Sequence, residues 1–325
     1  MVNEKSSTKY SVLEILREEE EPVSGEEIAA QTGVSRVSVW KAIQSLQSAG
    51  YGILSSKKGY FLAKDIRDSL FPWEFGAEEQ LVEHFLQTES TMIEARRIAE
   101  CSDRTVRIIT ADSQTNGYGK NNAPWTTTKG SLAFTIITRS QIPVAESHRI
   151  MMAAQIAWAE VLSDSTERRF FVRWPNDIWT ERGKTGGILD EISASGSLCR
   201  WLNLGIGINI TQKPDLSSAL CDCAFPGGTH FTRRELLSSF LRTFSKYERL
   251  ATEEPETLSK RWNSLCCDIG RTVQTTDADG LPVGRKAVFK GVDASGFVSL
   301  SYRRAGRNRK RLYPPGAISF IKTKI

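Results

Sequence analysis

The spacing of hydrophobic residues near the start of the chain predicts a small bundle of helices. Apolar residues between Val12 and Leu16 share one helical face, and an acidic run with Pro22 ends that helix. Ser24-Gly25-Glu26-Glu27 has the pattern of a capping box, with serine at N-cap and glutamate at N3. The pattern therefore predicts a second helix directly after the first.

A third helix and two strands complete this region. A tight turn leads to a helix that Ser35 caps, and short strands at 50–54 and 59–62 follow, joined by a basic loop. This order predicts a winged helix-turn-helix over residues 1–64, with the third helix in the DNA major groove and the wing against phosphates. Because the charges of the region roughly cancel, a module used only for packing or dimerisation is the alternative. The residues expected to contact DNA are Arg36, Trp40, Lys41, Gln44, Lys57 and Lys58.

The middle of the chain alternates between two periodicities. β-rich runs at 107–111, 131–137, 170–174 and 201–206 enclose helical patterns, notably 149–162, and residues 234–266 add one or two helices. This alternation predicts an α/β domain with a mixed sheet over residues 65–268. From 269 to 325, short strands separated by glycine-bearing turns predict a small β-barrel. The expected fold is therefore multidomain α+β.

Composition and charge exclude several classes of protein. The chain has 325 residues, 40% hydrophobic and 25% charged, with a net charge of +5, which permits a phosphate-bearing partner without requiring one. No signal peptide and no run of roughly 18 apolar residues predict a cytoplasmic protein without a membrane partner. Six cysteines are too few for a disulfide scaffold, and neither they nor the three histidines show metal-ligand spacing, so no protein-held metal site is expected.

One stretch indicates chemistry directly. Arg173-Trp174-Pro175-Asn176-Asp177 is followed, seven residues after the aspartate, by Lys184 and the pair Gly186-Gly187. The glycines let the backbone approach a ligand closely. A lysine beside them could hold two anionic groups together while they react. A structural salt bridge on a surface turn is the alternative interpretation of Lys184.

Three further clusters accompany this stretch. Ser90-Thr91 begins a helix and offers hydroxyls where the backbone also donates. Gln114 to Asn122 is a glycine-containing loop with one cation, suited to lie over phosphates. Gly205-Ile206-Gly207-Ile208-Asn209 forms the third. Each alone could be a turn, and a lone Gly-x-Gly is more often structural, but all four in this order are hard to obtain by chance.

The ordered set resembles the biotin–protein ligases, in the bifunctional bacterial form whose winged helix also makes it the biotin-operon repressor. The resemblance covers nearly the whole chain: 24–62 resembles the DNA-binding domain, 114–125 the adenylate loop, 205–209 the Gly-x-Gly-x-Asn strand and 273–320 the SH3-like barrel. It implies that biotin attacks the α-phosphate of Mg-ATP to give biotinyl-5′-AMP. A lysine on the biotin carboxyl carrier domain of a biotin-dependent carboxylase then takes the biotin. The implied cofactors are biotin, ATP and Mg²⁺.

The resemblance also assigns roles to single residues. Lys184 stands at the catalytic lysine, Asp177 orients Lys184 or the magnesium sphere, and Lys120 clamps phosphate. The implied biotin-binding residues are Ser90, Thr91, Met92, Gln114, Gly117, Tyr118, Gly119, Lys120, Lys184, Gly187, Gly205 and Gly207. The implied ATP-binding residues are Lys120, Asn121, Trp125, Asn176 and Asn209. A basic edge near the C-terminus would hold pyrophosphate or an acidic carrier domain, or is a solvated face: Arg303, Arg304, Arg307, Arg309, Lys310 and Arg311.

Departures from the family pattern raise a hypothesis about leakage. The family loop reads Gly-Arg-Gly-Arg-Arg-Gly, whereas Tyr118, Asn121 and Asn122 replace two arginines and the last glycine here, and Met92 stands where the family more often has asparagine. A lysine cannot reproduce the bidentate fork of arginine. We therefore expect weaker retention of the adenylate.

Other functions and the assembly remain open at the level of sequence. A biotin-sensing regulator without ligase activity is the alternative function. A lipoate or octanoyl transferase is disfavoured by the winged helix and the C-terminal tail. Operator DNA is an expected partner, and a homodimer that pairs central sheets edge to edge is expected when adenylate is bound.

Overall fold

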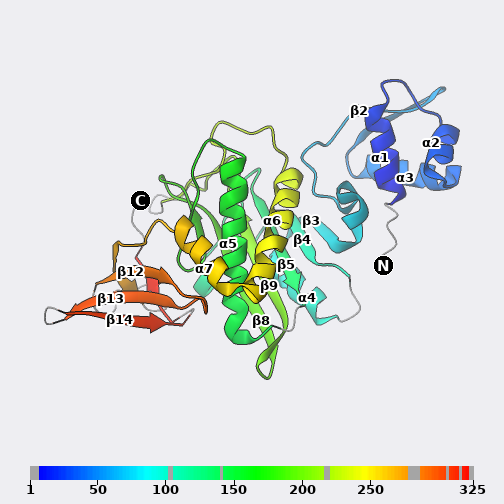
Figure 1. Ribbon diagram of the computed structural model, residues 1–325. Coiled ribbons are helices and arrows are strands. Elements are labelled where there is room, and N and C mark those ends of the chain that lie inside the picture. The colour runs from blue at the N-terminus through cyan, green and yellow to red at the C-terminus, as the bar shows by residue number, and fades with distance from the viewer. Residues whose placement is uncertain are drawn as a thin grey trace. The chain divides into compact units, whose positions relative to one another are not determined.

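A computed structural model describes residues 7–101, 105–139, 142–215, 220–276, 286–304, 307–314 and 317–321. The chain divides into two compact units, Met1–His84 and Phe85–Ile325 (Figure 1). The first unit holds the predicted helix-turn-helix, and the second holds the central sheet and the C-terminal strands.

The three N-terminal helices begin as their sequences predict. α1 (Thr8–Glu18), α2 (Gly25–Thr32) and α3 (Arg36–Ser48) each start after a serine whose hydroxyl accepts a backbone N–H of the first turn. The capping box between Ser24 and Glu27 is confirmed, with both reciprocal bonds present. Gly33, at φ 69°, ends α2 in the left-handed conformation that glycine adopts without steric cost. β1 (Gly52–Ser56) and β2 (Gly59–Lys64) then form the antiparallel wing.

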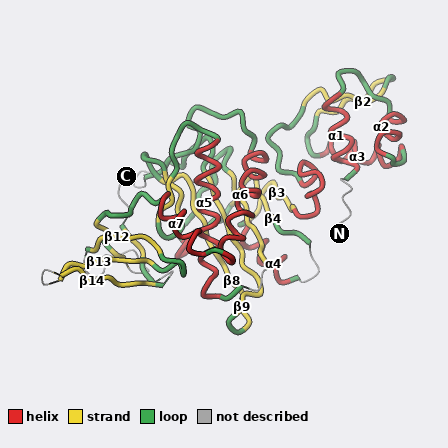
Figure 2. Tube along the Cα trace, viewed as in Figure 1, coloured by secondary structure: helices red, strands yellow, loops and turns green. Residues whose placement is uncertain are grey.

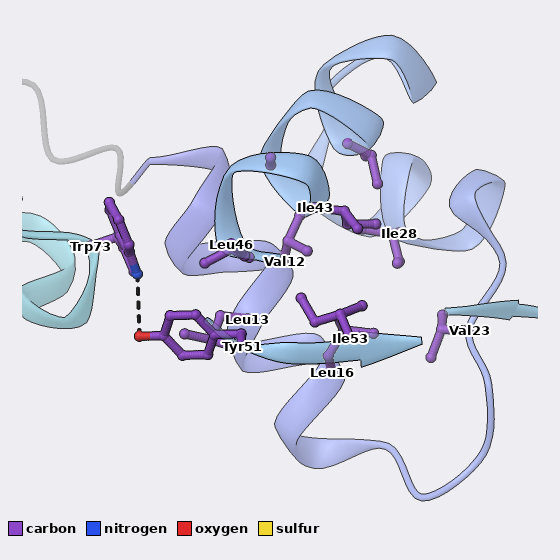
Figure 3. Packing of buried hydrophobic residues seen from close by; sticks show 12 residues of the cluster. Val12, Leu13, Leu16, Val23, Ile28, Ile43, Leu46, Tyr51, Ile53 and Trp73 are labelled. Atoms are coloured by element: carbon purple, nitrogen blue, oxygen red, sulfur yellow. Dashed lines mark hydrogen bonds between the residues drawn. The ribbon is translucent and has the colours of Figure 1, made fainter. Parts of the chain in front are cut away.

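The core of the first unit extends beyond the wing. Val12, Leu13, Ile28 and Ile43 have no exposed surface and meet between the three helices. The 3₁₀ segment η1 (Pro72–Leu81) adds Trp73 to this cluster (Figure 3). The segment after β2 therefore packs onto the winged helix and is part of its core.

A partly buried charge network holds that later segment in place. The Arg17 guanidinium donates to both carboxylate oxygens of Asp65, at 3.1 and 3.0 Å, and to both of Glu74, at 3.0 and 2.9 Å. Glu74 is only 5% exposed and also accepts from the Tyr51 hydroxyl. Trp73 Nε1 donates to the same hydroxyl at 3.3 Å. Because Arg17 lies on α1, the network joins the two ends of the unit.

A seven-stranded sheet forms the centre of the second unit, in the order β3-β4-β5-β9-β8-β7-β6. Its strands are β3 (Val82–Thr88), β4 (Ile108–Gln114), β5 (Leu132–Thr138), β6 (Phe171–Arg173), β7 (Asp177–Trp179), β8 (Lys184–Ser195) and β9 (Leu198–Ile208). The pairs from β4 through β9 to β6 are antiparallel. At the other edge, β3 and β4 run in the same direction. Just after these strands, Thr115 N donates to Thr88 O and Asn116 N donates to Glu89 O, so the two segments advance together, as in a parallel pair. The predicted mixed sheet is confirmed.

Helices cover both faces of this sheet. They are α4 (Thr91–Glu100), α5 (Ser147–Asp164), α6 (Arg233–Glu253) and α7 (Pro255–Leu265), with η2 (Lys120–Asn122) and η3 (Val144–Glu146) in connections. Phe134 of β5 packs on Trp158 of α5 and Phe240 of α6, whereas Thr135 bonds to Thr91 of α4. Since successive strand residues point to opposite faces, α4 lies opposite α5 and α6. The described helices include none that could span a membrane.

The C-terminal strands form two small sheets, and the larger one includes β12, β13 and β14 (Figure 2). β10 (Thr272–Val273), β12 (Ala287–Val292), β13 (Val298–Arg304) and β14 (Arg307–Tyr313) make one antiparallel sheet, and β11 (Thr275–Thr276) pairs with β15 (Ser319–Phe320). Phe289 packs edge-on against Trp262 of α7 and against Phe320. The predicted β-rich tail is present, but closure into a barrel is not seen among the described residues. We expected one of these short strands at 285–290; its first residue, Arg285, lies outside the described residues, and the strand β12 begins at Ala287.

Candidate active site

A cavity of about 300 Å³ gathers the sequence clusters at one end of β8 and β9. The start of α4, the loop before β5, the Pro175–Asp177 segment and both glycine strands contribute to its wall. We refer to it below as the reactant cavity. Its lining residues include Ser90, Thr91, Met92, Gln114, Tyr118, Gly119, Lys120, Asn121, Trp125, Asn176, Asp177, Lys184, Gly187, Gly205 and Gly207.

Lys184 lies at the first position of β8 and faces an acidic partner. Its Nζ is 2.9 Å from Oδ1 of Asp177, whose side chain is 4% exposed. Trp179 Nε1 donates to the other carboxylate oxygen of Asp177 at 3.3 Å. The short β7–β8 pairing, with Asp177 opposite Gly187, places aspartate and lysine side by side. Lys184 therefore stands on a sheet strand rather than on a surface turn, and Asp177 fixes its position.

Glycines in β9 make room for two large side chains. A Cβ on Gly205 would lie 2.6 Å from Met92 Sδ, and one on Gly207 would lie 2.3 Å from the Trp125 ring. These separations are too short for real contacts, so only glycine permits this packing. Because positions 205 and 207 point to the same face of the sheet, Gly-x-Gly lets both Met92 and Trp125 pack against this face of β9 and line the cavity.

The amide of Gln114 is held by the start of α4. Its Oε1 accepts from Thr91 N at 2.8 Å and from Thr91 Oγ1 at 3.2 Å. Thr135 Oγ1 donates to Thr91 Oγ1 at 2.9 Å from the neighbouring strand β5. Hydroxyl and amide groups are therefore held in place at the end of the cavity next to α4, where they can hydrogen-bond a polar ligand.

The loop at 117–125 carries one cation over the cavity. Lys120 Nζ donates to Ser319 Oγ at 3.1 Å, and burial lowers the pKa of this lysine. Asn121 and Asn122 take left-handed conformations, with φ of 57° and 56°. The Tyr118 hydroxyl donates to Glu191 at 3.0 Å, and burial raises its pKa. The tyrosine that stands in place of an arginine is thus tied to β8.

Two expected site residues lie outside the residues that line the cavity. Gly117 accepts Trp125 N at 2.8 Å through its carbonyl and so shapes the loop. Asn209 is buried, and its Nδ2 donates to Asp222 O at 3.0 Å. The expected basic edge falls on the β13–β14 hairpin; the side chains described there, Arg303, Arg309, Lys310 and Arg311, are exposed and do not line the cavity.

Several lining residues carried no signal in the sequence. Ser319 and Phe320 approach from β15, far along the chain, and no local pattern marks them. The other lining residues without a predicted role are apolar, and they lie in the 114–125 loop, in the Trp174-Pro175 motif or in the strands β8 and β9. These remaining lining residues are Ala123, Pro124, Pro175, Ile188, Leu189 and Ile206.

The outer face of α3 presents the residues expected to contact DNA. Arg36, Lys41 and Gln44 are exposed, and Trp40 is 53% exposed, which is unusual for an indole. Lys57 and Lys58 are exposed between the wing strands. Gln47 also lies on α3, but its side chain turns to the wing: its Nε2 donates to Ile53 O of β1 at 2.6 Å.

Comparison with known proteins agrees with this division of the chain. The family described as HTH domain matches residues 8–61, and the Biotin/lipoate A/B protein ligase family matches residues 85–209. The bifunctional ligase/repressor BirA of Bacillus subtilis is 28% identical over 86% of this chain and 89% of its own length. BirA of Escherichia coli is 24% identical, over 85% of this chain and 87% of its own.

A solved structure shows the same fold over most of the chain. The biotin protein ligase from Aquifex aeolicus in complex with biotin and ATP superposes with a TM-score of 0.60 at 20% identity, covering 74% of this chain and 99% of that one. Fold and site define a helix-turn-helix domain joined to a ligase-type sheet domain. The chain combines an HTH domain with a domain of the biotin/lipoate A/B protein ligase family, and it is homologous to BirA.

Proposed function

We propose that this protein is an ATP-dependent biotin–protein ligase that forms biotinyl-5′-AMP and transfers biotin to a lysine of a biotin carboxyl carrier domain. The observation that carries the proposal is the Lys184–Asp177 pair in the wall of the reactant cavity, 2.9 Å apart. The same chain carries a winged helix-turn-helix, so it also acts as a biotin-responsive repressor.

The first step brings two anions together. The biotin carboxylate oxygen attacks the α-phosphorus of ATP, and pyrophosphate leaves with the bonding electrons. Repulsion between carboxylate and phosphate opposes this approach unless a cation lies between them. Lys184 supplies that charge as a compact donor that touches both groups, and Asp177 holds its Nζ in position. Lys120 adds a second positive charge from the loop.

Different parts of the cavity wall make different contacts with the substrates, some polar and some apolar. Gln114, Thr91 and Ser90 offer hydrogen bonds to the ureido ring of biotin, and Gly205 and Gly207 let the backbone approach its ring closely. Trp125 closes the nucleotide side of the cavity. Its ring lies 5.5 Å from Lys184 Nζ, so the indole also stabilises the lysine charge.

Magnesium enters as the counterion of ATP. Within the described part of the chain, no group of three His, Cys, Asp or Glu side chains could hold a metal ion. Asp177 is the one carboxylate among the described residues that line the reactant cavity. This donor set fits Mg²⁺, which is typically bound by one or two carboxylates together with substrate phosphates.

The ligase activity is tested with purified protein, biotin, Mg-ATP and an apo carrier domain. Pyrophosphate release and carrier biotinylation are measured for the wild type, Lys184→Ala and the exposed control Lys129→Ala. We expect both activities in the wild type and the control, and a loss of at least a hundredfold in Lys184→Ala, the size of a removed transition-state charge contact. Biotin binding without either activity in the wild type would instead identify a biotin-sensing regulator.

We propose that α3 and the wing bind operator DNA. Because Lys41 would contact a phosphate, Lys41→Ala should weaken binding and lower the slope of log affinity against log salt by about one. The measurement is fluorescence anisotropy with duplexes selected by the wild type from a random pool, and Lys129→Ala is the control. Equal slopes in the variant and the control would remove Lys41 from the interface.

The finer architecture is also proposed. We assign residues 1–64 to DNA binding, 65–268 to biotin and ATP, and 269–325 to an SH3-like barrel, supported by the antiparallel strands around Phe289.

We further propose a homodimer that pairs central sheets edge to edge. β7 faces β8 only as far as Gly187, so the later part of β8 offers hydrogen-bonding groups to a second strand.

A further inference from the structure

A second cavity, of about 510 Å³, adjoins the reactant cavity. Lys120, Asn121, Pro175, Asn176 and Leu189 line both. Its volume falls in the range of small-molecule sites, roughly 300–1,000 Å³. Once biotinyl-5′-AMP has formed in the reactant cavity, the acceptor amine must reach its acyl carbon through a neighbouring space. Because these five residues line both cavities, the second cavity is such a neighbouring space.

The charges of the two cavities differ. Lys184 and Lys120 both line the reactant cavity, which suits phosphates. In the second cavity Lys120 is the one cation among the described lining residues, Asp190 adds a carboxylate, and much of the remaining wall is apolar: Val144, Ala145, Met151, Ile192 and Phe297. Such a wall fits a lysine side chain, with its hydrocarbon stem and cationic head. For a pyrophosphate it offers a single lysine next to the like-charged carboxylate of Asp190, which makes it less suited to an anion than the reactant cavity.

Two titratable groups of this cavity, the half-buried Asp190 and the buried His148, have shifted pKa values. Burial raises the pKa of Asp190, although the nearby charge of Lys120 opposes the shift. His148 is 4% exposed, and its Nε2 has no hydrogen-bond partner in the described structure. Burial lowers the pKa of His148 to about 3, so the imidazole is neutral and does not repel a cation.

A lysine that enters this space would meet the same desolvation. Burial disfavours the charged form of an ammonium and lowers its pKa, while it raises that of Asp190. The two pKa values approach each other, so the cost of moving the proton from nitrogen to carboxylate falls. An apolar cavity therefore favours a neutral amine beside a neutral acid over a buried ion pair.

We infer that the second cavity admits the acceptor lysine of the carrier domain and that Asp190 takes the proton from its ammonium group. The inference rests on the proposed ligase function. The neutral amine nitrogen bonds to the acyl carbon of biotinyl-5′-AMP. The bond from that carbon to the phosphate-bridging oxygen breaks, and AMP leaves with the electron pair. The second amine proton passes to solvent, and Asp190 returns its proton to water after product release.

The test separates the two half-reactions in single turnover. Wild type and Asp190→Asn are first loaded with biotin and Mg-ATP, and pyrophosphate release reports the adenylate. Each is then mixed with either an apo carrier domain or hydroxylamine. Hydroxylamine is neutral near pH 7 and small, so it needs neither a proton acceptor nor the cavity wall. Asp190→Glu restores the carboxylate, and Glu146→Gln removes a nearby carboxylate that does not line the cavity.

We expect Asp190→Asn to form adenylate and react with hydroxylamine at wild-type rates. Its transfer to the carrier should be about tenfold slower, the size of one charge-assisted hydrogen bond. Asp190→Glu should recover part of the rate, and Glu146→Gln should match the wild type. Unchanged carrier transfer in Asp190→Asn, or an equal loss with hydroxylamine, would overturn the inference. A wild type that releases no pyrophosphate would refute the proposed function itself, and the inference with it.

Discussion

The indole ring of Trp125 lies against the backbone of Gly207, so closely that a Cβ there would fall 2.3 Å from a ring carbon. The backbone N–H of Trp125 also donates to Gly117 O at 2.8 Å. The Gly117–Trp125 loop is therefore anchored at its far end by a contact that only glycine allows. This contact links the second glycine of the β9 motif to the geometry of the loop that carries Lys120.

Gly207→Ala should displace Trp125 and loosen the loop. Alanine fits the extended backbone of β9, so the fold should persist while the indole moves. We expect adenylate formation to fall about ten- to a hundredfold, as for other displaced positioning groups, mainly through higher KM values for ATP and biotin. Gly227→Ala is the control, since a Cβ there meets nothing within 4 Å. Wild-type kinetics in Gly207→Ala would show that the ring position does not matter.

Lys120→Arg should retain the adenylate longer. Lys120 is the one basic residue from Gly117 to Asn122, and it donates to Ser319 Oγ. An arginine would grip a phosphate with a bidentate fork and slow dissociation of biotinyl-5′-AMP by about five- to tenfold. Release of labelled adenylate into a chase of unlabelled ligand measures this rate, with Lys129→Arg as control. Equal off-rates would contradict the leakage hypothesis.

His148 should make stability depend on pH. Burial lowers its pKa to about 3, whereas an unfolded histidine titrates near roughly 6.5. Between these values the unfolded state binds a proton that the folded state does not, so stability falls as pH falls. The slope from one such group is at most about 1.4 kcal/mol per pH unit.

His148→Leu should remove that contribution. Chemical denaturation at pH 7 and 5.5 should show a smaller loss of unfolding free energy in the variant, by about 1 kcal/mol. The exposed His230→Leu should keep the wild-type dependence. Parallel pH profiles for the wild type and His148→Leu would mean that His148 accepts a proton in the folded state.

Arg17→Ala should destabilise the first unit selectively. Glu74 is 5% exposed and would lose its cationic partner while it stays buried, which costs about 3–5 kcal/mol for a broken buried pair. Hydrogen exchange should quicken in α1 and α3 but not in the sheet of the second unit. Arg36→Ala breaks an exposed pair with Glu26 and should cost less than about 1 kcal/mol. Similar exchange in both variants would show that the Arg17 network adds little.

Local signals in the sequence determined the helices, their caps and the order of the site motifs. Ser24, Glu27 and Gly33 act within one helix, and the periodicity of Val39, Ile43 and Leu46 reports a buried face directly. Such features depend on neighbours a few residues away, which a pattern can record. The sequence likewise marked Lys184 and the glycines of β9, because their spacing is fixed by two adjacent strands.

Only the tertiary structure decided which distant groups meet. Ser319 reaches Lys120, Glu74 reaches Arg17, and Asp190 comes to line a cavity with His148. No periodicity marks these residues, because each contact joins segments far apart in the chain and depends on how whole elements pack. Gly207 shows the same limit, since the sequence placed it beside a ligand, and the fold revealed that Trp125 fills the space its missing side chain leaves.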